Sequence, residues 1–441
     1  MASLGTPLDE MSEHELLDAA GACVDALWRA EVDLLLIAEQ WAVLHAPERL
    51  DPHESAKPGR ESVKQLGGPG TPEVTEFAAS GLAARIGRSP YAAAQLIGDA
   101  LDLTNRLPQL WARVQAGEVR SSYARHVARA TRDLEPAEAA YVAAAVVESA
   151  DGRLPWSRFE TLVAAKVAQA APERAREQEI RRAQATFARK TANEGNGMAS
   201  FLVRADVATI EAIDGAVAHR AGQLAALQPD LSADHRRVLA ALQLATGAAP
   251  DADLGDSLPQ VQLFVHVYDG PEREVVARVE GHGPVTDAWV RKFLGPRARF
   301  KVQPVLDLAG QAPVDAYEIP DRHRQAVHLM TPADTFPHAA CTSRAMQVDH
   351  TIPYDAGGES GIGNYGPMTT THHRIKTHGR WQVRQPFPGI YLWRDPHGAF
   401  YVVDHTGTRR LPSDPSVPAT RMTVVELWEE TAIQVRYEPA A

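Results

Sequence analysis

Apolar residues recur at steps of three and four through the first half of the chain, and this spacing is the strongest constraint on its fold. Near the start the recurring positions include Leu16, Ala20 and Cys23. Later stretches repeat the pattern, and SPYAAAQLIGDALDLTNRL adds a helix cap at Ser89 followed by proline in the first turn. Because this spacing puts the apolar side chains on one helix face, we predict an all-helical domain over roughly residues 10–248.

Chain length and local composition predict how the chain divides into domains. At 441 residues it is too long for one compact core, which predicts two or three domains. Residues 51–75 are polar and rich in proline and glycine, so we interpret them as a loop or linker. From about residue 258, PQVQLFVHVYDG and VQPVLDLAG predict strands, and between them VVARVEGHGPVTDAWVRKFL predicts a strand, a turn and a helix capped by Thr286 or Asp287. Beyond residue 380, alternating apolar residues with glycine turns predict a β-meander.

Charge and cysteine content limit where the protein works. The formal net charge is -11, so the surface as a whole does not suit nucleic acid, although a local basic patch still can. Cys23 and Cys341 form no disulfide framework, which predicts a reducing, cytoplasmic compartment. The polar start differs from a signal peptide, and the apolar run VDLLLIAEQWAVL is too short to cross a bilayer. We therefore expect a soluble cytoplasmic protein with no membrane partner.

One segment gathers side chains that bind metals. Residues 347–379, QVDHTIPYDAGGESGIGNYGPMTTTHHRIKTHG, are called here the histidine-rich segment. The pattern predicts a short strand ended by Pro353, a glycine-rich loop, and a helix that begins near residues 369–371 and ends at Gly379. This order brings together Asp349, His350, Asn364, His372 and His373.

These residue types suit phosphodiester hydrolysis. A carboxylate and an imidazole can hold one divalent cation and leave positions for water and phosphate oxygens. A histidine off the metal can take the proton from water, and an asparagine carbonyl can orient that imidazole. Neighbours in a regular strand point to opposite faces, so the strand must end or bulge near Asp349 and His350 for both to serve one site. On the helix, His372 and His373 lie about 100° apart, so one of them faces the metal.

Ordinary structural roles for the histidines are the alternative to a metal site. The spacing argues against that alternative, because an asparagine lies fourteen residues after Asp-His and His-His-x-x-Lys follows it. The pattern DHTIPYDAGG…N…HHRIKTHG resembles the HNH, or ββα-metal, nuclease motif. The resemblance implies Asp349 as a metal ligand, His350 as the general base, Asn364 as the loop residue that orients or assists, and His373 as the second metal ligand. It implies Mg²⁺ or Mn²⁺ as the cofactor, with catalytic Zn²⁺ as another option, and DNA as the partner.

The wider chain resembles a family from bacteria with GC-rich genomes, in which a long helical N-terminal domain of unknown function precedes an HNH domain. SPYAAAQLIGDALDLTNRLPQLWARVQAGEV, VEGHGPVT and HHRIKTHGRWQV carry that likeness. The predicted fold class is α+β. Its predicted parts are a helical domain over 1–250, a mixed α/β connecting segment over 251–330, the HNH domain over 331–385, and a β-hairpin extension with a C-terminal tail over 386–441.

One feature of the sequence differs from the usual HNH pattern. Many HNH proteins surround the motif with a zinc ion held by two Cys-x-x-Cys pairs. Here Thr369 and His372 stand where the second pair would be, and Cys341 has no cysteine nearby. We therefore expect no structural four-cysteine zinc. The expected replacement is packing by Phe336, Met346 and Trp381.

Basic residues follow the motif. Seven lysines and arginines lie between residues 374 and 410 against two aspartates, which favours a phosphate backbone as partner. We expect DNA contacts from Arg374, Lys376, Arg380 and Arg384. The predicted function is a metal-dependent HNH endonuclease. The alternative is a nucleic-acid-binding protein of a mobile or repeated family with a catalytically weak or inactive HNH fold, whereas a zinc peptidase is disfavoured because HExxH is absent.

Overall fold

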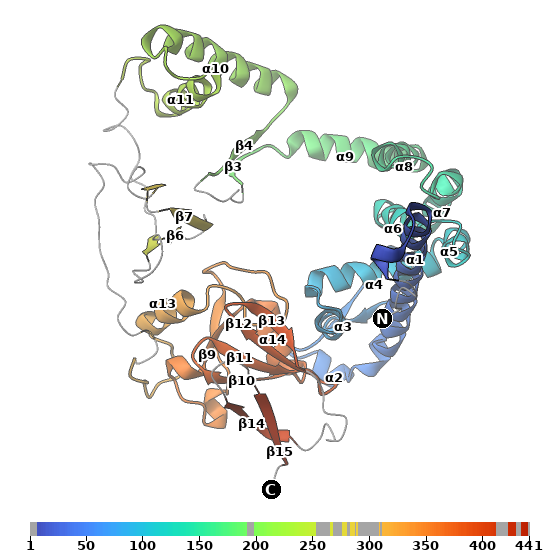
Figure 1. Ribbon diagram of the computed structural model, residues 1–441, viewed down its shortest axis with the longest axis vertical. Helices are drawn as coiled ribbons and strands as arrows, with labels where there is room; N and C mark the ends of the chain where they lie inside the picture. Colours follow the sequence, from blue (N-terminus) through green and yellow to red (C-terminus); the bar gives the residue numbers. More distant parts are fainter. Residues whose placement is uncertain are drawn as a thin grey trace. The chain divides into compact units, whose positions relative to one another are not determined.

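The computed structural model describes most of the chain (Figure 1). The described residues are 7–191, 198–252, 265–267, 276–279, 283–286, 288–289, 308, 311–411, 422–428 and 434–439. Contacts divide the chain into two compact units, Met1–Ala171 with Pro304–Ala441 and, separately, Pro172–Gln303. The first unit joins the beginning of the chain to its end, so this division differs from the boundary expected near residue 250. Its described N-terminal part is mainly helical and the C-terminal region carries small sheets, which makes the fold α+β.

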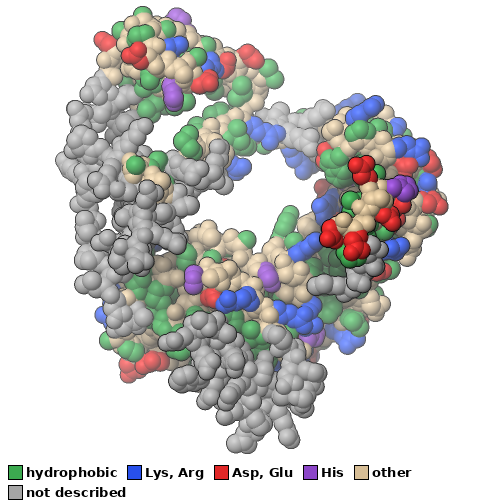
Figure 2. All heavy atoms as spheres, in the orientation of Figure 1, with side chains coloured by type: hydrophobic (Ala, Val, Ile, Leu, Met, Phe, Trp, Pro, Cys, Tyr) green, Lys and Arg blue, Asp and Glu red, His purple; other side chains and the backbone are tan. Residues whose placement is uncertain are grey.

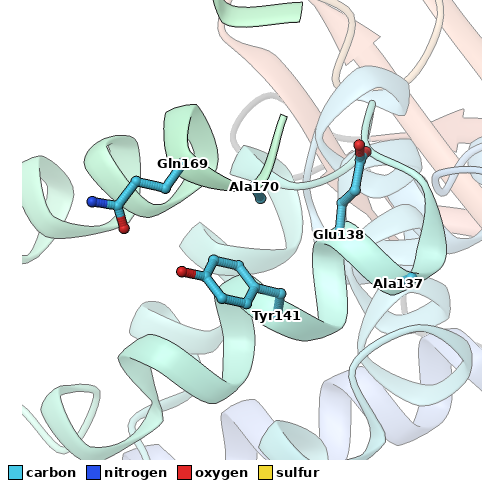
Figure 3. Close-up of a pocket in the computed structure, with 5 residues that line it drawn as sticks. All are labelled: Ala137, Glu138, Tyr141, Gln169 and Ala170. Carbon is cyan, nitrogen blue, oxygen red and sulfur yellow. The ribbon is translucent and has the colours of Figure 1, made fainter. Parts of the chain in front are cut away.

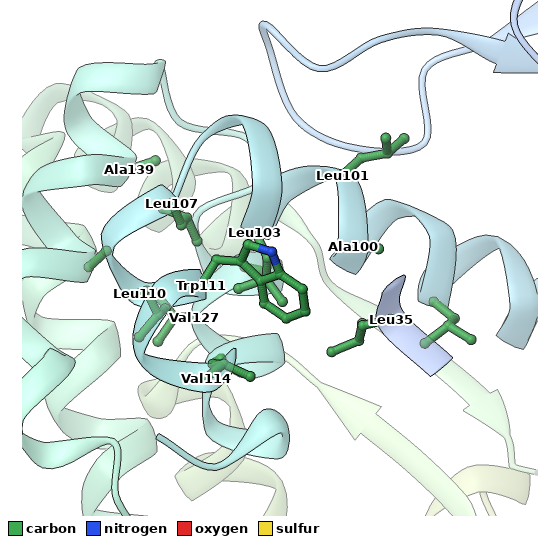
Figure 4. Close-up of a cluster of buried hydrophobic side chains, with 14 of the residues drawn as sticks. Leu35, Ala100, Leu101, Leu103, Leu107, Leu110, Trp111, Val114, Val127 and Ala139 are labelled. Carbon is green, nitrogen blue, oxygen red and sulfur yellow. The ribbon is translucent and has the colours of Figure 1, made fainter. Parts of the chain in front are cut away.

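Helices dominate the N-terminal part of the first unit. They are α1 (Glu13–Leu44), α2 (Pro52–Ser55), α3 (Ala78–Ile86), α4 (Pro90–Asn105), α5 (Pro108–Gln115), α6 (Ser121–Ala130), α7 (Pro136–Val146) and α8 (Trp156–Ala170). The predicted cap of α4 is confirmed, because the Ser89 hydroxyl accepts from the Ala92 amide at 3.3 Å. Leu103, Leu107 and Trp111 lie in the core that these helices share (Figure 4). In the described residues, no helix combines the length and the apolar character that crossing a bilayer requires.

Two aspartates of α4 are buried within this helical part. Asp99 has no exposed surface and accepts hydrogen bonds from Arg125, Arg129 and Arg132 at 2.6–3.1 Å. Asp102, one turn further along, pairs with Arg106 at 3.0 Å and with the Nε of Arg132 at 2.8 Å. These contacts connect α4 to α6 and to the residues that follow α6.

Residues 51–75 are mostly irregular, which agrees with the predicted loop, but they do not form a linker. The segment contains α2 and two short strands, β1 (Val63–Lys64) and β2 (Val74–Thr75), which pair antiparallel. The amide of Gly68 donates to Asp102 at 2.7 Å, and a side chain at Gly68 would meet the Arg106 guanidinium. The segment is packed against the helices because its backbone hydrogen bonds are satisfied by buried groups.

The second unit combines helices and small sheets. Its elements are α9 (Pro172–Gln184), β3 (Phe187–Lys190), β4 (Phe201–Arg204), α10 (Val207–Leu227), α11 (Ala233–Thr246), β5 (Val265–Val267), β6 (Val276–Val279) and β7 (Gly283–Thr286). The all-helical prediction fails here, because β3 and β4 form an antiparallel pair. The strands predicted near residues 265 and 276 are present, and the Thr286 hydroxyl accepts from the Trp289 amide as predicted for a cap. The strand predicted in VQPVLDLAG lies outside the described residues, apart from Leu308.

The C-terminal part of the first unit contains the histidine-rich segment. Its elements are α13 (Asp321–Met330), β8 (Gln347–His350), β9 (Tyr365–Met368), α14 (Thr370–His378), β10 (Gln382–Phe387), β11 (Ile390–Arg394), β12 (Phe400–Asp404), β13 (Gly407–Arg410), β14 (Met422–Trp428) and β15 (Gln434–Pro439). Strands β10 to β13 pair in order, which confirms the predicted meander. Trp381, Tyr391 and Trp393 are buried in the core of this part, together with Phe77 and Ala84 from the N-terminal part.

We predict that Asp99→Ala lowers the free energy of unfolding by about 3–5 kcal/mol, because arginines that lie partly in the protein interior lose their counter-ion. Urea unfolding followed by circular dichroism measures this change. Lys57→Ala is the control, since it removes an exposed pair with Glu54 and should change little. Equal effects of the two substitutions would show that the buried aspartate has no special importance.

Candidate functional site

The histidine-rich segment folds as a strand, a loop, a strand and a helix. Strand β8 pairs antiparallel with β9, with Asp349 opposite Gly366 and His350 opposite Tyr365. Helix α14 then begins after Thr369, whose hydroxyl accepts from the His372 amide at 3.4 Å. The predicted helix limits are confirmed, whereas the strand ends at His350, before the predicted end at Pro353, and strand β9 was not predicted. Because β8 ends at His350, the two neighbours Asp349 and His350 can differ in environment, the first partly exposed and the second buried.

The two residues expected to bind metal lie together. The Nε2 atom of His373 is 3.3 Å from Oδ2 of Asp349. The other ring nitrogen, Nδ1, lies 2.8 Å from the side-chain carbonyl oxygen of Gln347. That oxygen can only accept, so Nδ1 donates to it, and Nε2 is the ring nitrogen that faces Asp349.

This arrangement fits a divalent cation. Two ligands that bind one ion at right angles, each at about 2.1 Å, stand about 3 Å apart, which is close to the observed spacing. Within the part of the chain that the structure describes, no group of three or more His, Cys, Asp or Glu could form a larger metal site. The residues present would therefore hold a cation through one carboxylate and one imidazole.

His350 is held from one side by a serine. Its Nε2 atom is 2.9 Å from the Ser360 hydroxyl, which itself donates to the carbonyl of Ala316 at 2.5 Å. Because the single hydroxyl proton goes to that carbonyl, Ser360 accepts from Nε2 and leaves Nδ1 without a proton. His350 is 2% exposed, and the ring of Tyr317 lies nearly parallel to it at 5.9 Å. Burial lowers the pKa of His350, and nearby Lys376 lowers it further although Asp349 raises it, so the imidazole is neutral near pH 7.

Asn364 does not orient His350 among the described contacts, contrary to our expectation. Its side-chain oxygen accepts from the Thr351 hydroxyl at 2.5 Å and from the Ile352 amide at 2.8 Å. Its side-chain nitrogen donates to the carbonyls of Ile352 and Glu359, both at 2.9 Å. Asn364 thus uses its full hydrogen-bonding capacity to hold the loop that carries Ser360.

A buried carboxylate contacts Thr369 and His372, which stand where the second cysteine pair was expected. Asp334 is 3% exposed and accepts from His372 Nδ1 at 2.7 Å, from the Thr369 amide at 2.8 Å and from the Phe336 amide at 2.9 Å. The Phe336 ring also stacks on His372 at 4.4 Å. The expected packing of Phe336 against Trp381 is present, and the hydrogen bonds of Asp334 are an addition that we did not foresee.

Arg374 has a structural contact in place of the predicted DNA contact. Its guanidinium donates to both oxygens of Glu76 at 2.8 and 2.9 Å, and to the carbonyls of Gly59 and Arg60. Glu76 lies just before α3, so this bidentate ion pair connects the N-terminal part directly to α14. A guanidinium with these four acceptors has few donors left for a phosphate.

Lys376 is also engaged, whereas Arg380 and Arg384 are exposed. The Lys376 ammonium donates to Asp349 Oδ2 at 2.5 Å and to the carbonyl of His350. Arg380 and Arg384 form no ion pair with any described residue and lie beyond the end of α14. Figure 2 shows lysines and arginines gathered on the visible face where Figure 1 places α14, β12 and β13. The DNA contacts of Arg380 and Arg384 stay a prediction.

A surface pocket elsewhere in the first unit offers no competing site. It has a volume of about 300 Å³ and is lined by Ala137, Glu138, Tyr141, Gln169 and Ala170 (Figure 3). Its one carboxylate, Glu138, accepts from the Glu135 amide at 2.9 Å and so caps α7. Figure 3 shows this carboxylate directed away from Tyr141. The histidine-rich segment therefore stays the candidate site.

Comparison with known proteins adds no further evidence about this site: no family model, no curated protein and no solved structure matches the chain. The geometry of the site and the resemblance of its motif are the observations that support it.

We predict that the Glu76–Arg374 pair contributes stability that disappears in acid. Burial raises the pKa of Glu76, but hydrogen bonds from Arg374, Ser62 and Lys64 outweigh it and lower the pKa from 4.5 to about 2. A carboxyl whose pKa is depressed stabilises the fold fully above about pH 4.5 and progressively less as pH falls toward 2.

Glu76→Gln should therefore lower the free energy of unfolding by roughly 1–3 kcal/mol at pH 7, and the difference from wild type should shrink as the pH falls from 4.5 to about 2. Denaturant titrations at several pH values measure it. Glu48→Gln, an exposed carboxylate on the N-terminal part, is the control. A difference that stays constant with pH would contradict the ion pair.

Proposed function

We propose that this chain is a metal-dependent HNH endonuclease that hydrolyses DNA phosphodiester bonds. The observation that carries the proposal is the pairing of Asp349 Oδ2 with His373 Nε2 at 3.3 Å, with the His350 backbone immediately beside Asp349. A carboxylate, a metal-oriented imidazole and a second, neutral imidazole are the three groups that this reaction needs.

Asp349 and His373 would hold a divalent cation, which when bound supplies positive charge to stabilise the developing charge on the phosphate. His350 takes a proton from a water molecule through Nδ1 as the water oxygen forms a bond to phosphorus. The bond from phosphorus to the leaving sugar oxygen breaks, and that oxygen is protonated from water. Ser360 keeps the His350 ring in the tautomer that this proton transfer requires.

Two observations favour the alternative, a nucleic-acid-binding protein with a weak or inactive HNH fold. His350 is 2% exposed, and the Lys376 ammonium already lies on Asp349. A general base must contact water, and a metal ligand must be free of a competing positive charge. A site that kept the present contacts rigidly would therefore hydrolyse DNA slowly. Cleavage assays separate the two proposals.

We predict that purified protein nicks plasmid DNA with Mg²⁺ or Mn²⁺, and that His350→Ala lowers single-turnover cleavage by about 10²–10⁴ with DNA affinity nearly unchanged. The reason is that a general base acts in the transition state. His405→Ala, an exposed histidine in the turn between β12 and β13, is the control and should cleave like wild type. If wild type and His350→Ala cleave equally, His350 is not the base.

We predict that Arg380 and Arg384 act on binding instead. Replacing both with glutamine should weaken duplex binding and reduce the slope of log affinity against log salt by about 0.9 for each lost phosphate contact. Gel-shift titrations at several salt concentrations measure the slope. Arg158→Gln, an exposed arginine of α8, is the control. An unchanged slope in the double variant would place the DNA on another surface.

A further inference from the structure

Lys376 makes a contact that the proposed chemistry does not use. Its side chain is only 8% exposed, and its ammonium donates to Oδ2 of Asp349 at 2.5 Å and to the carbonyl of His350. The same oxygen of Asp349 faces Nε2 of His373 at 3.3 Å. One carboxylate oxygen is therefore approached by a lysine and by the imidazole that would share a cation with it.

The position of Lys376 on the helix explains this geometry. It follows His373 by three residues on α14, so the two side chains lie on the same helix face. A lysine ammonium is a compact charge on a flexible stem of four carbons, which can reach Asp349 and can also leave it.

A divalent cation and this ammonium cannot both bind Oδ2 without a cost. Two positive charges about 4 Å apart repel each other strongly where little water screens them. Cation binding therefore favours movement of the ammonium away from Asp349. A displaced lysine in a site this buried is stable only when it finds another negative partner.

We propose that Lys376 is an internal counter-ion that competes with the divalent cation for Asp349 and moves to a DNA phosphate when the cation binds. This inference rests on the proposed function, since it takes the same cation site and the same DNA. It makes cation binding and DNA binding mutually dependent: a phosphate that receives Lys376 tightens the cation, and by linkage the cation tightens the DNA. Protein without DNA then binds the cation weakly.

Calorimetric titration of Mn²⁺ into DNA-free protein tests the competition. Lys376→Met should bind Mn²⁺ about tenfold more tightly than wild type, because the competing charge is gone, whereas Lys376→Arg should stay within about threefold of wild type. Lys64→Met is the matched control, because that lysine pairs with Glu76 and not with Asp349. Lys376→Gln replaces Lys376→Met if circular dichroism shows that the methionine variant is unfolded.

A second titration tests the linkage. With His350→Ala in the background, so that DNA stays intact, a short duplex should tighten Mn²⁺ binding about tenfold more when Lys376 is present than in Lys376→Met, where only the direct attraction between phosphate and cation remains.

The possible results distinguish failure of the counter-ion role of Lys376 from failure of the metal site. If Mn²⁺ binds wild type and is lost in Asp349→Ala, but Lys376→Met binds no more tightly than wild type, the counter-ion role is wrong and the metal site stands. If the duplex tightens Mn²⁺ equally in both backgrounds, the transfer of Lys376 to phosphate is wrong. If Mn²⁺ binds neither wild type nor any variant, or binds Asp349→Ala as well as wild type, both the metal assignment and the counter-ion role are wrong.

Discussion

The candidate site depends on one buried carboxylate, that of Asp334. It accepts hydrogen bonds from the Thr369 amide at the start of α14, from His372 in the first turn and from the Phe336 amide in the preceding loop. The carboxylate thus fixes the end of α14 from which His373 projects. In the HNH proteins that this motif resembles, zinc and four thiolates often hold the corresponding region. Here an aspartate, a histidine and a stacked phenylalanine occupy it, and hydrogen bonds with packing provide the connection.

A second contact holds α14 from a residue much earlier in the chain. Arg374, the residue after His373, forms a two-pronged pair with Glu76, and Phe77 packs into the core beneath the meander. The N-terminal helical part and the histidine-rich segment therefore belong to one compact unit. The helical part, which carries no candidate chemistry, has a physical role in this arrangement: it restrains the helix that presents His373. Asp99 and Asp102 in turn keep α4 joined to its neighbours, so the restraint reaches into the helical core.

Local features of the fold could be predicted from sequence, and distant pairings could not. The cap at Ser89 and the limits of α14 at Thr369 and Gly379 follow from residues within one turn, and each is present. Glu76 lies 298 residues from Arg374, and no local pattern connects the two, so Arg374 was assigned to DNA. The packing of residues 51–75 against the helices was missed for the same reason, because composition does not reveal the buried Asp102 that binds this loop.

The sequence predicted part of the candidate site, as it predicted part of the fold. The motif indicated Asp349 and His373 correctly as neighbours, since the strand, loop and helix order brings them together. The orienting contact of His350 was assigned to Asn364, whereas Ser360 makes it, because a hydroxyl in a glycine-rich loop carries no distinctive spacing. A signal for Lys376 was present: its three-residue distance from His373 on a helix places both on one face. Gln347, two residues before Asp349 on β8, also lies on the same strand face as Asp349, and it contacts His373.

Spectroscopic detection of the metal–histidine bond tests the cation site at Asp349 and His373 most directly. Pulsed electron paramagnetic resonance of Mn²⁺ bound to protein labelled with ¹⁵N-histidine reports nitrogen atoms coordinated to the ion. We expect one directly bound histidine nitrogen in wild type, which disappears in His373→Ala and persists in His350→Ala. A bound nitrogen that persists in His373→Ala, or Mn²⁺ with no histidine nitrogen in wild type, would contradict this expectation.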